Sequence, residues 1–72
     1  MNRLEAMTLF VRVADLGSFA AAANQLGVAR SVVTRQIAAL EEHLGVKLIV
    51  RTTRKLTLTS AGVDYLDKCR TI

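Results

Sequence analysis

The stretch LGVARSVVTRQIAAL, residues 26–40, decides how this chain folds. Gly27 interrupts the pattern that precedes it, and the residues that follow repeat with the period of an α-helix. The apolar residues of this helix, which extends toward Gly45, are Val33, Ile37, Leu40 and Leu44. At about 100° per residue, the opposite side carries Ser31, Thr34, Arg35 and Ala38. The sequence therefore predicts an amphipathic helix whose hydrogen-bond donors are segregated from its core-facing side.

A second predicted helix, SFAAAANQLG at residues 18–27, comes just before this one. Ser18 is a good N-cap, and Gly27 supplies the turn that ends the helix. The apolar repeat of this helix consists of Phe19, Ala22, Ala23 and Leu26. Ala23 lets another helix approach closely, and Val33 fills the angle between the two helices. This spacing is typical of a helix-turn-helix, whose second helix enters the major groove of DNA.

Two further helices are predicted toward the ends of the chain. Residues 2–17, NRLEAMTLFVRVADLG, place Asn2 and Glu5 in the arrangement of a capping box and Gly17 at the exit. Their apolar stripe is formed by residues 6, 9, 10, 13 and 14. The last helix begins near Thr59, its expected N-cap. Its residues at helical spacing are Val63, Leu66 and Cys69 or Arg70.

Between the third and fourth helices the period of the sequence changes. Residues 47–50 and 55–58 are short β-rich runs, with a polar tip at 51–54 between them. This pattern predicts a two-stranded hairpin that needs packing support from the helices. Its basic residues around the tip are Arg51, Arg54 and Lys55. They suit a wing that lies along the DNA backbone or over the minor groove, and the alternative is that they protect a strand edge against aggregation.

The distribution of charge favours a polyanionic partner. The formal net charge is +4. Six of the ten basic residues but only two of the six acidic ones lie between Val28 and Ser60, so the whole excess falls in one part of the chain. Nucleic acid or an anionic membrane surface would be attracted to such a segment, although a solvated basic face is the plainer alternative.

Length and composition limit the classes of protein to which this chain can belong. Seventy-two residues, 51% of them hydrophobic, predict one small folded domain rather than a disordered tail. The single cysteine, Cys69, cannot form an intramolecular disulfide and is expected to be an ordinary helix residue. Arg12 and Asp15 interrupt the first apolar run, so neither a signal peptide nor a membrane span is predicted. We therefore expect a cytoplasmic protein.

An enzyme is not expected. The single histidine, His43, follows Glu41 and Glu42 at a helix end, where a solvated histidine is favoured by the helix dipole. The sequence shows no metal-ligand cluster and no phosphate-binding glycine loop. The serious alternative is a winged-helix module that binds another protein, which would not need clustered donors and excess positive charge. RNA binding is disfavoured because no aromatic platform for stacked bases is evident.

Three stretches carry a family resemblance. They are FVRVADLGSFAAAANQLGV at 10–28, SVVTRQIAALEEHLGVKL at 31–48 and RTTRKLTLTSAG at 51–62. On these residues the chain resembles the N-terminal winged helix-turn-helix domain of the LysR-type transcriptional regulators of bacteria. The resemblance runs from about Leu4 to Gly62.

The resemblance implies a mainly α fold and a division of the chain. A winged helix-turn-helix domain would occupy 1–59, with a three-helix core, the helix-turn-helix at 19–38 and a two-stranded β wing at about 47–58. Residues 60–72 would start a long linker helix, through which the full-length protein self-associates. Double-stranded operator DNA would be the partner, in the cytoplasm at the nucleoid. No cofactor is expected in this domain, and a C-terminal domain outside these residues would bind a small-molecule inducer.

The resemblance also implies which residues touch DNA and which pair two copies of the chain. The expected DNA contacts are Ser18, Ala29, Arg30, Ser31, Thr34, Arg35, Arg51, Thr53, Arg54 and Lys55. The expected dimer contacts are Val63, Leu66 and Arg70. Ala29 stands where the family usually has serine, which costs about 1 kcal/mol of helix capping. Arg30 stands where many members have glutamine, which shifts the expected base from adenine to guanine.

Overall fold

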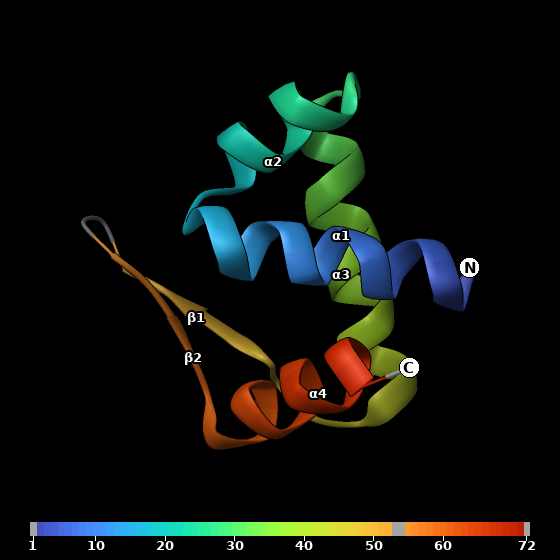
Figure 1. Cartoon of the computed structure of the whole chain (residues 1–72), viewed down its shortest axis with the longest axis vertical. Helices are drawn as coiled ribbons and strands as arrows, with labels where there is room; N and C mark the ends of the chain where they lie inside the picture. The colour runs from blue at the N-terminus through green and yellow to red at the C-terminus, as the bar shows by residue number, and fades with distance from the viewer. Residues whose placement is uncertain (1, 53–54, 72) are drawn as a thin grey trace.

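The computed structural model describes residues 2–52 and 55–71. Its elements are α1 (Arg3–Leu16), α2 (Phe19–Leu26), α3 (Arg30–Leu44), β1 (Ile49–Arg51), β2 (Leu56–Leu58) and α4 (Ser60–Thr71). In Figure 1, α1 crosses in front of α3, α2 lies at one end of α3, and α4 lies beside its other end. The two strands form a hairpin that projects from one side of this helical body, at the left in Figure 1. The predicted mainly α, winged helix-turn-helix architecture is therefore confirmed.

The predicted helix-turn-helix is present between α2 and α3. Ser18 caps α2, because its Oγ accepts from the Ala21 amide at 3.1 Å. Gly27 ends α2 in the left-handed conformation, with φ +69°, which an L side chain would strain. The following amide of Val28 donates to the carbonyl of Ala23 at 3.0 Å and so closes the turn. This turn directs the chain immediately into α3.

The core lies between the first three helices and the base of the hairpin. Its buried members are Ala6, Leu9, Phe10, Val13, Phe19, Ala22, Ala23, Val33, Ile37, Leu40, Leu48 and Ile49. These include ten of the thirteen positions that the helical periodicity of the first three helices assigns to the inside, and Ala14 and Leu44 are half-buried. Leu26 is an exception, because it lies exposed at the last residue of α2, beyond the reach of the core. Asn2 caps α1 by accepting from the Glu5 amide, so this half of the predicted capping box is formed.

The hairpin is shifted along the chain from its predicted position. Ile49 pairs with Leu58 and Arg51 with Leu56 in an antiparallel register, so Arg51 belongs to a strand and not to the tip. Lys47 and Leu48 lie before β1, because their backbone groups are bonded elsewhere. The Lys47 carbonyl accepts from the Thr59 hydroxyl at 2.6 Å, and the Leu48 carbonyl accepts from the Thr59 amide at 3.0 Å.

Helix α4 packs back onto the core. Thr59 caps it as predicted, since its Oγ1 accepts from the Gly62 amide at 2.9 Å. The ring of Tyr65 lies 5.8 Å from that of Phe10, measured between centroids. Cys69 is half-buried against the core, and burial raises the pKa of its thiol, so it is a packing residue with little thiolate character.

Within residues 2–52 and 55–71, no helix combines the length and apolar character needed to cross a membrane.

Candidate nucleic-acid interface

Four of the expected DNA contacts lie in the first two turns of α3, and helical periodicity assigns three of them, Ser31, Thr34 and Arg35, to the side opposite the core. Arg30, Ser31 and Arg35 are exposed, and Thr34 is half-buried. The Thr34 hydroxyl donates to the Arg30 carbonyl at 3.1 Å, and Arg35 Nε donates to the Ser31 carbonyl at 3.4 Å. In the free protein Thr34 therefore offers its hydroxyl mainly as an acceptor. Arg35 keeps its terminal guanidinium nitrogens available as donors.

These residues divide between two sides of α3. Thr34 lines a hollow that faces the hairpin, together with Phe19 and Arg51. Arg35 lines a separate shallow hollow on α3 itself, with Val32 and Gln36. The sequence places both residues opposite the core, but the hairpin covers one flank of the helix. Thr34 consequently lies between the recognition helix and the hairpin, while Arg35 lies clear of the hairpin.

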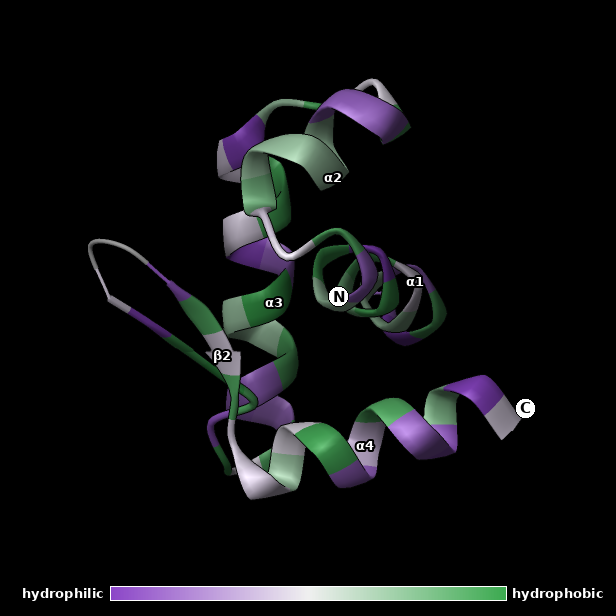
Figure 2. Ribbon diagram, turned by 60° about the vertical axis from the view of Figure 1, so that its left-hand side comes forward, coloured by the Kyte–Doolittle hydropathy of each residue, from purple (hydrophilic) through white to green (hydrophobic). Residues whose placement is uncertain are grey.

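A groove between α2, the start of α3 and the hairpin gathers three of the expected contact residues with positive charge. We call it the basic groove; its lining residues are Gly17, Ser18, Phe19, Ala20, Arg30, Arg51, Thr52, Lys55 and Leu56. Arg30 comes from α3, whereas Arg51 and Lys55 come from the hairpin. In Figure 2 the hydrophilic residues of the hairpin lie toward its outer end, and the hydrophobic ones lie toward its base. The fold therefore brings cations from two separate segments of the chain to one surface.

The remaining expected DNA contacts are placed as follows. Ser18 lines the basic groove while its Oγ caps α2. Ala29 is exposed just before α3 and, as predicted, gives that helix no side-chain cap. Thr53 and Arg54 lie outside the described residues. The residues that flank them in the sequence, Thr52 and Lys55, are held together, because the Thr52 amide donates to the Lys55 carbonyl at 2.8 Å.

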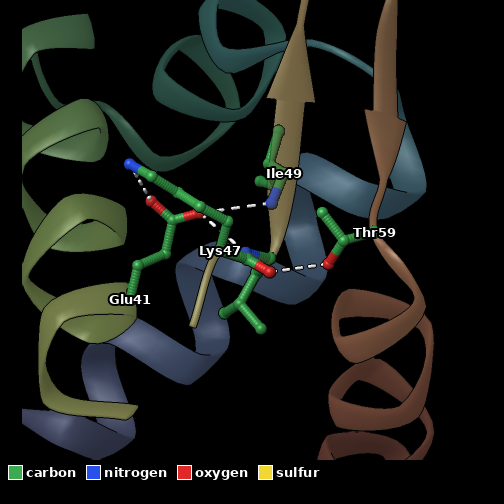
Figure 3. A network of polar contacts seen from close by, with 5 residues as sticks. Glu41, Lys47, Ile49 and Thr59 are labelled. Atoms are coloured by element: carbon green, nitrogen blue, oxygen red, sulfur yellow. Dashed lines mark hydrogen bonds and ion pairs between the residues drawn. The ribbon is translucent and has the colours of Figure 1, made fainter. Parts of the chain in front are cut away.

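A polar network ties α3 to the base of the hairpin (Figure 3). It was not predicted from the sequence. Glu41 Oε2 accepts from the amides of Leu48 and Ile49, at 2.8 and 3.2 Å. Its Oε1 lies 3.8 Å from Lys47 Nζ. Only a weak feature of the sequence points to Glu41: it follows Ile37 by four residues and so lies at the edge of the apolar stripe of α3. This carboxylate fixes where the hairpin leaves the helical body.

The expected dimer contacts have different surroundings in the single chain. Val63 is 54% exposed on α4. Leu66 packs against the core of its own chain. Arg70 forms an ion pair with Asp15, which joins α4 to the end of α1. Of the three, Val63 is the apolar residue most open to another copy of the chain, and Leu66 is half-buried.

Three helices, a tight turn between the second and third, and a hairpin beside the third define the winged helix-turn-helix class. The chain belongs to the LysR family of bacterial regulatory helix-turn-helix proteins, because the model of that family matches residues 4–63. An HTH-type transcriptional repressor of Pseudomonas aeruginosa is 49% identical over 72 residues, which are 100% of this chain and 23% of that protein. The regulator CrgA of Neisseria meningitidis is 48% identical over 94% of this chain and 23% of its own length.

Solved structures agree with this assignment. The crystal structure of the CbnR DBD–DNA complex matches with a TM-score of 0.90 and 41% identity, over 94% of this chain and 78% of that one. The BenM DBD–catB site 1 DNA complex matches with a TM-score of 0.90 and 34% identity, over 94% and 76% of the two chains. The chain spans less than a quarter of the length of the curated relatives described above.

Proposed function

We propose that this chain is the sequence-specific DNA-binding portion of a LysR-type transcriptional regulator. One observation carries the proposal: Arg30 at the start of α3 and Arg51 and Lys55 of the hairpin line the same basic groove. A duplex that received α3 in its major groove would bring its phosphate backbone against the hairpin side of this groove. Two related domains are solved in complex with DNA, which supports DNA binding by this chain.

The residues have distinct roles in this proposal. Arg30 donates two hydrogen bonds to one base, with guanine as the preferred partner. The other outward residues near the start of α3 adjust base and phosphate contacts; they are Ala29, Ser31, Thr34 and Arg35. Ser18 and the hairpin residues Arg51, Thr53, Arg54 and Lys55 contact the backbone or the minor groove. The α3 residues therefore set sequence preference, and the hairpin supplies affinity that is independent of sequence.

The larger protein is proposed to follow the plan of its family. Residues 1–59 are the DNA-binding domain, and 60–72 begin the helix through which two copies associate, with contacts at Val63, Leu66 and Arg70. An inducer-binding domain follows outside these residues, and the domain described here needs no cofactor. The regulator acts in the cytoplasm, at the nucleoid, and catalyses no reaction.

Duplex binding should depend strongly on salt. Each cation that contacts a phosphate releases counterions, so Lys55→Ala should reduce the slope of log affinity against log salt by about 0.9 on any sequence. Lys68→Ala, an exposed change on α4 away from the basic groove, is the matched control and should leave the slope unchanged. Fluorescence anisotropy of a labelled duplex at several salt concentrations measures both. Absent or salt-insensitive binding would contradict the proposal and favour a protein-binding module.

The 72-residue chain is expected to be mostly monomeric at micromolar concentration. Helix α4 has 12 residues, and Leu66 and Arg70 already contact their own chain. Short helices with little exposed apolar surface pair poorly. Sedimentation velocity should therefore show mostly monomer. Because a monomer contacts one half-site only, the 72-residue chain should bind DNA weakly. A tight dimer under these conditions would show that α4 supplies a sufficient interface.

A further inference from the structure

We propose that Phe19 is a positioning residue for DNA binding: its ring holds the Arg51 guanidinium in the basic groove. This inference rests on the proposed function and adds a residue to it. The central observation is that Arg51 Cζ lies 4.4 Å from the centroid of the Phe19 ring. Phe19 belongs to the helix-turn-helix and Arg51 to the hairpin, so the contact joins the two DNA-binding elements.

The strand register explains why Arg51 reaches the ring. Side chains alternate between the two faces of a strand, so Ile49 and Arg51 share one face of β1 and Val50 has the other. Ile49 is 9% exposed and Val50 is 49% exposed, so the face of Ile49 is the inward one. Arg51 therefore continues the core-facing side of the hairpin at the point where the helical core ends. Its side chain is directed along the helices instead of away from them.

The surroundings of Phe19 make its ring a fixed platform. It is the first residue of α2, directly after the capped Ser18, and it is 7% exposed within the core cluster. A guanidinium over an aromatic face is attracted by the ring quadrupole, and this contact uses none of its N–H donors. Within residues 2–52 and 55–71, the ion pairs are Lys47–Glu41 and Arg70–Asp15, and neither involves Arg51. The donors of Arg51 thus stay available while its position is restricted.

Restricting Arg51 before DNA arrives should raise affinity. A free arginine loses many rotamers when it is fixed on a phosphate or in a narrow groove, and the ring removes part of that loss in advance. The same contact holds Arg51 near Arg30, which lines the same groove from α3. Phe19 thereby sets the spacing between the recognition helix and the hairpin cation without touching DNA itself.

A double-mutant cycle in duplex affinity tests this role. Phe19→Leu, which keeps an apolar side chain and removes the ring, should weaken binding about two- to fivefold. The same change made in an Arg51→Ala background should have no further effect. Phe19→Tyr keeps the ring and should restore the affinity. Phe10→Leu is the matched control, since it alters a fully buried aromatic residue that does not contact Arg51, and any effect should be additive with Arg51→Ala.

Equal losses from Phe19→Leu in both backgrounds would overturn the inference, because they would show a packing effect that does not act through Arg51. If Phe19→Leu does not fold, Phe19→Met offers the same cycle with a more adaptable side chain. An NMR measurement on the unaltered chain adds a readout that needs no variant. Ring-current upfield shifts of the Arg51 side-chain protons are expected, and their absence would overturn the inference. Failure of the unaltered chain to bind any duplex would instead contradict the proposed function.

Discussion

Gly62→Ala should destabilise the fold by about 2–3 kcal/mol, although alanine is the better helix former. The reason is the close approach of α4 to the chain that enters β1. A Cβ on Gly62 would overlap the carbonyl oxygen of Leu48 and lie 3.0 Å from its carbonyl carbon. These are backbone atoms of a fully buried residue, so no side-chain rotation can relieve the overlap. Either α4 or the base of the hairpin has to move.

Urea denaturation followed by circular dichroism measures this loss. A domain of this size has a total stability of about 4–10 kcal/mol, so the expected loss is a large part of the whole. Ser60→Ala, an exposed change in the same helix, is the matched control and should alter stability by no more than about 0.5 kcal/mol. A Gly62→Ala protein as stable as the parent would show that α4 does not pack on Leu48 in solution.

Glu41→Ala should cost about 2–3 kcal/mol of folding stability through a different mechanism. It leaves the amides of Leu48 and Ile49 without their shared acceptor, at residues that are both buried. A buried donor without a partner costs about 1–3 kcal/mol. Because these amides mark the entry into β1, the change should also loosen the hairpin relative to α3.

Two variants separate the hydrogen bonds from the charge of this network. Glu41→Gln keeps an oxygen acceptor of the same shape and should lose less than the alanine variant. Lys47→Ala removes an ion partner whose side chain is 79% exposed, whereas that of Glu41 is 11% exposed. Surface ion pairs contribute about 0–1 kcal/mol, so Lys47→Ala should have the smallest effect. Denaturation midpoints in the order Lys47→Ala, Glu41→Gln, Glu41→Ala support the mechanism, and equal losses for Lys47 and Glu41 contradict it.

The helices were predictable because their information is local. Periodic apolar residues fix the inward face of α1, α2 and α3, and caps such as Ser18 and Gly27 mark their ends within a few residues. The exact hairpin was not predictable from pattern alone. Lys47 looks like a strand residue, but its carbonyl accepts from Thr59, twelve residues later. Such a contact depends on the tertiary approach of two segments, which no local period encodes.

The candidate interface, like the fold, was predictable where it depends on local sequence and not where it depends on tertiary contacts. That Ser31 and Arg35 lie opposite the core was predictable from helical spacing. That Arg30 joins Arg51 in one groove, while Arg35 faces another hollow, was not, because it depends on the direction of the hairpin. From the sequence, Phe19 is predicted to be an ordinary core residue. The neighbouring residues do not indicate which cation lies over its ring. The two positioning features, Glu41 and Phe19, both link segments that are distant in the sequence.

In the proposed interface, α3 reads base pairs and the hairpin holds the phosphate backbone. The most direct test of these roles selects bound sequences from a random duplex library and then titrates the parent chain and Arg30→Ala against the selected site and single-base-pair variants. A preferred sequence should emerge, and Arg30→Ala should weaken binding to it by about 10- to 100-fold. On the duplex already changed at the contacted base pair, the same substitution should have much less effect. Failure to enrich any sequence, or an equal loss on every duplex, would contradict base reading by Arg30 and leave it a phosphate contact.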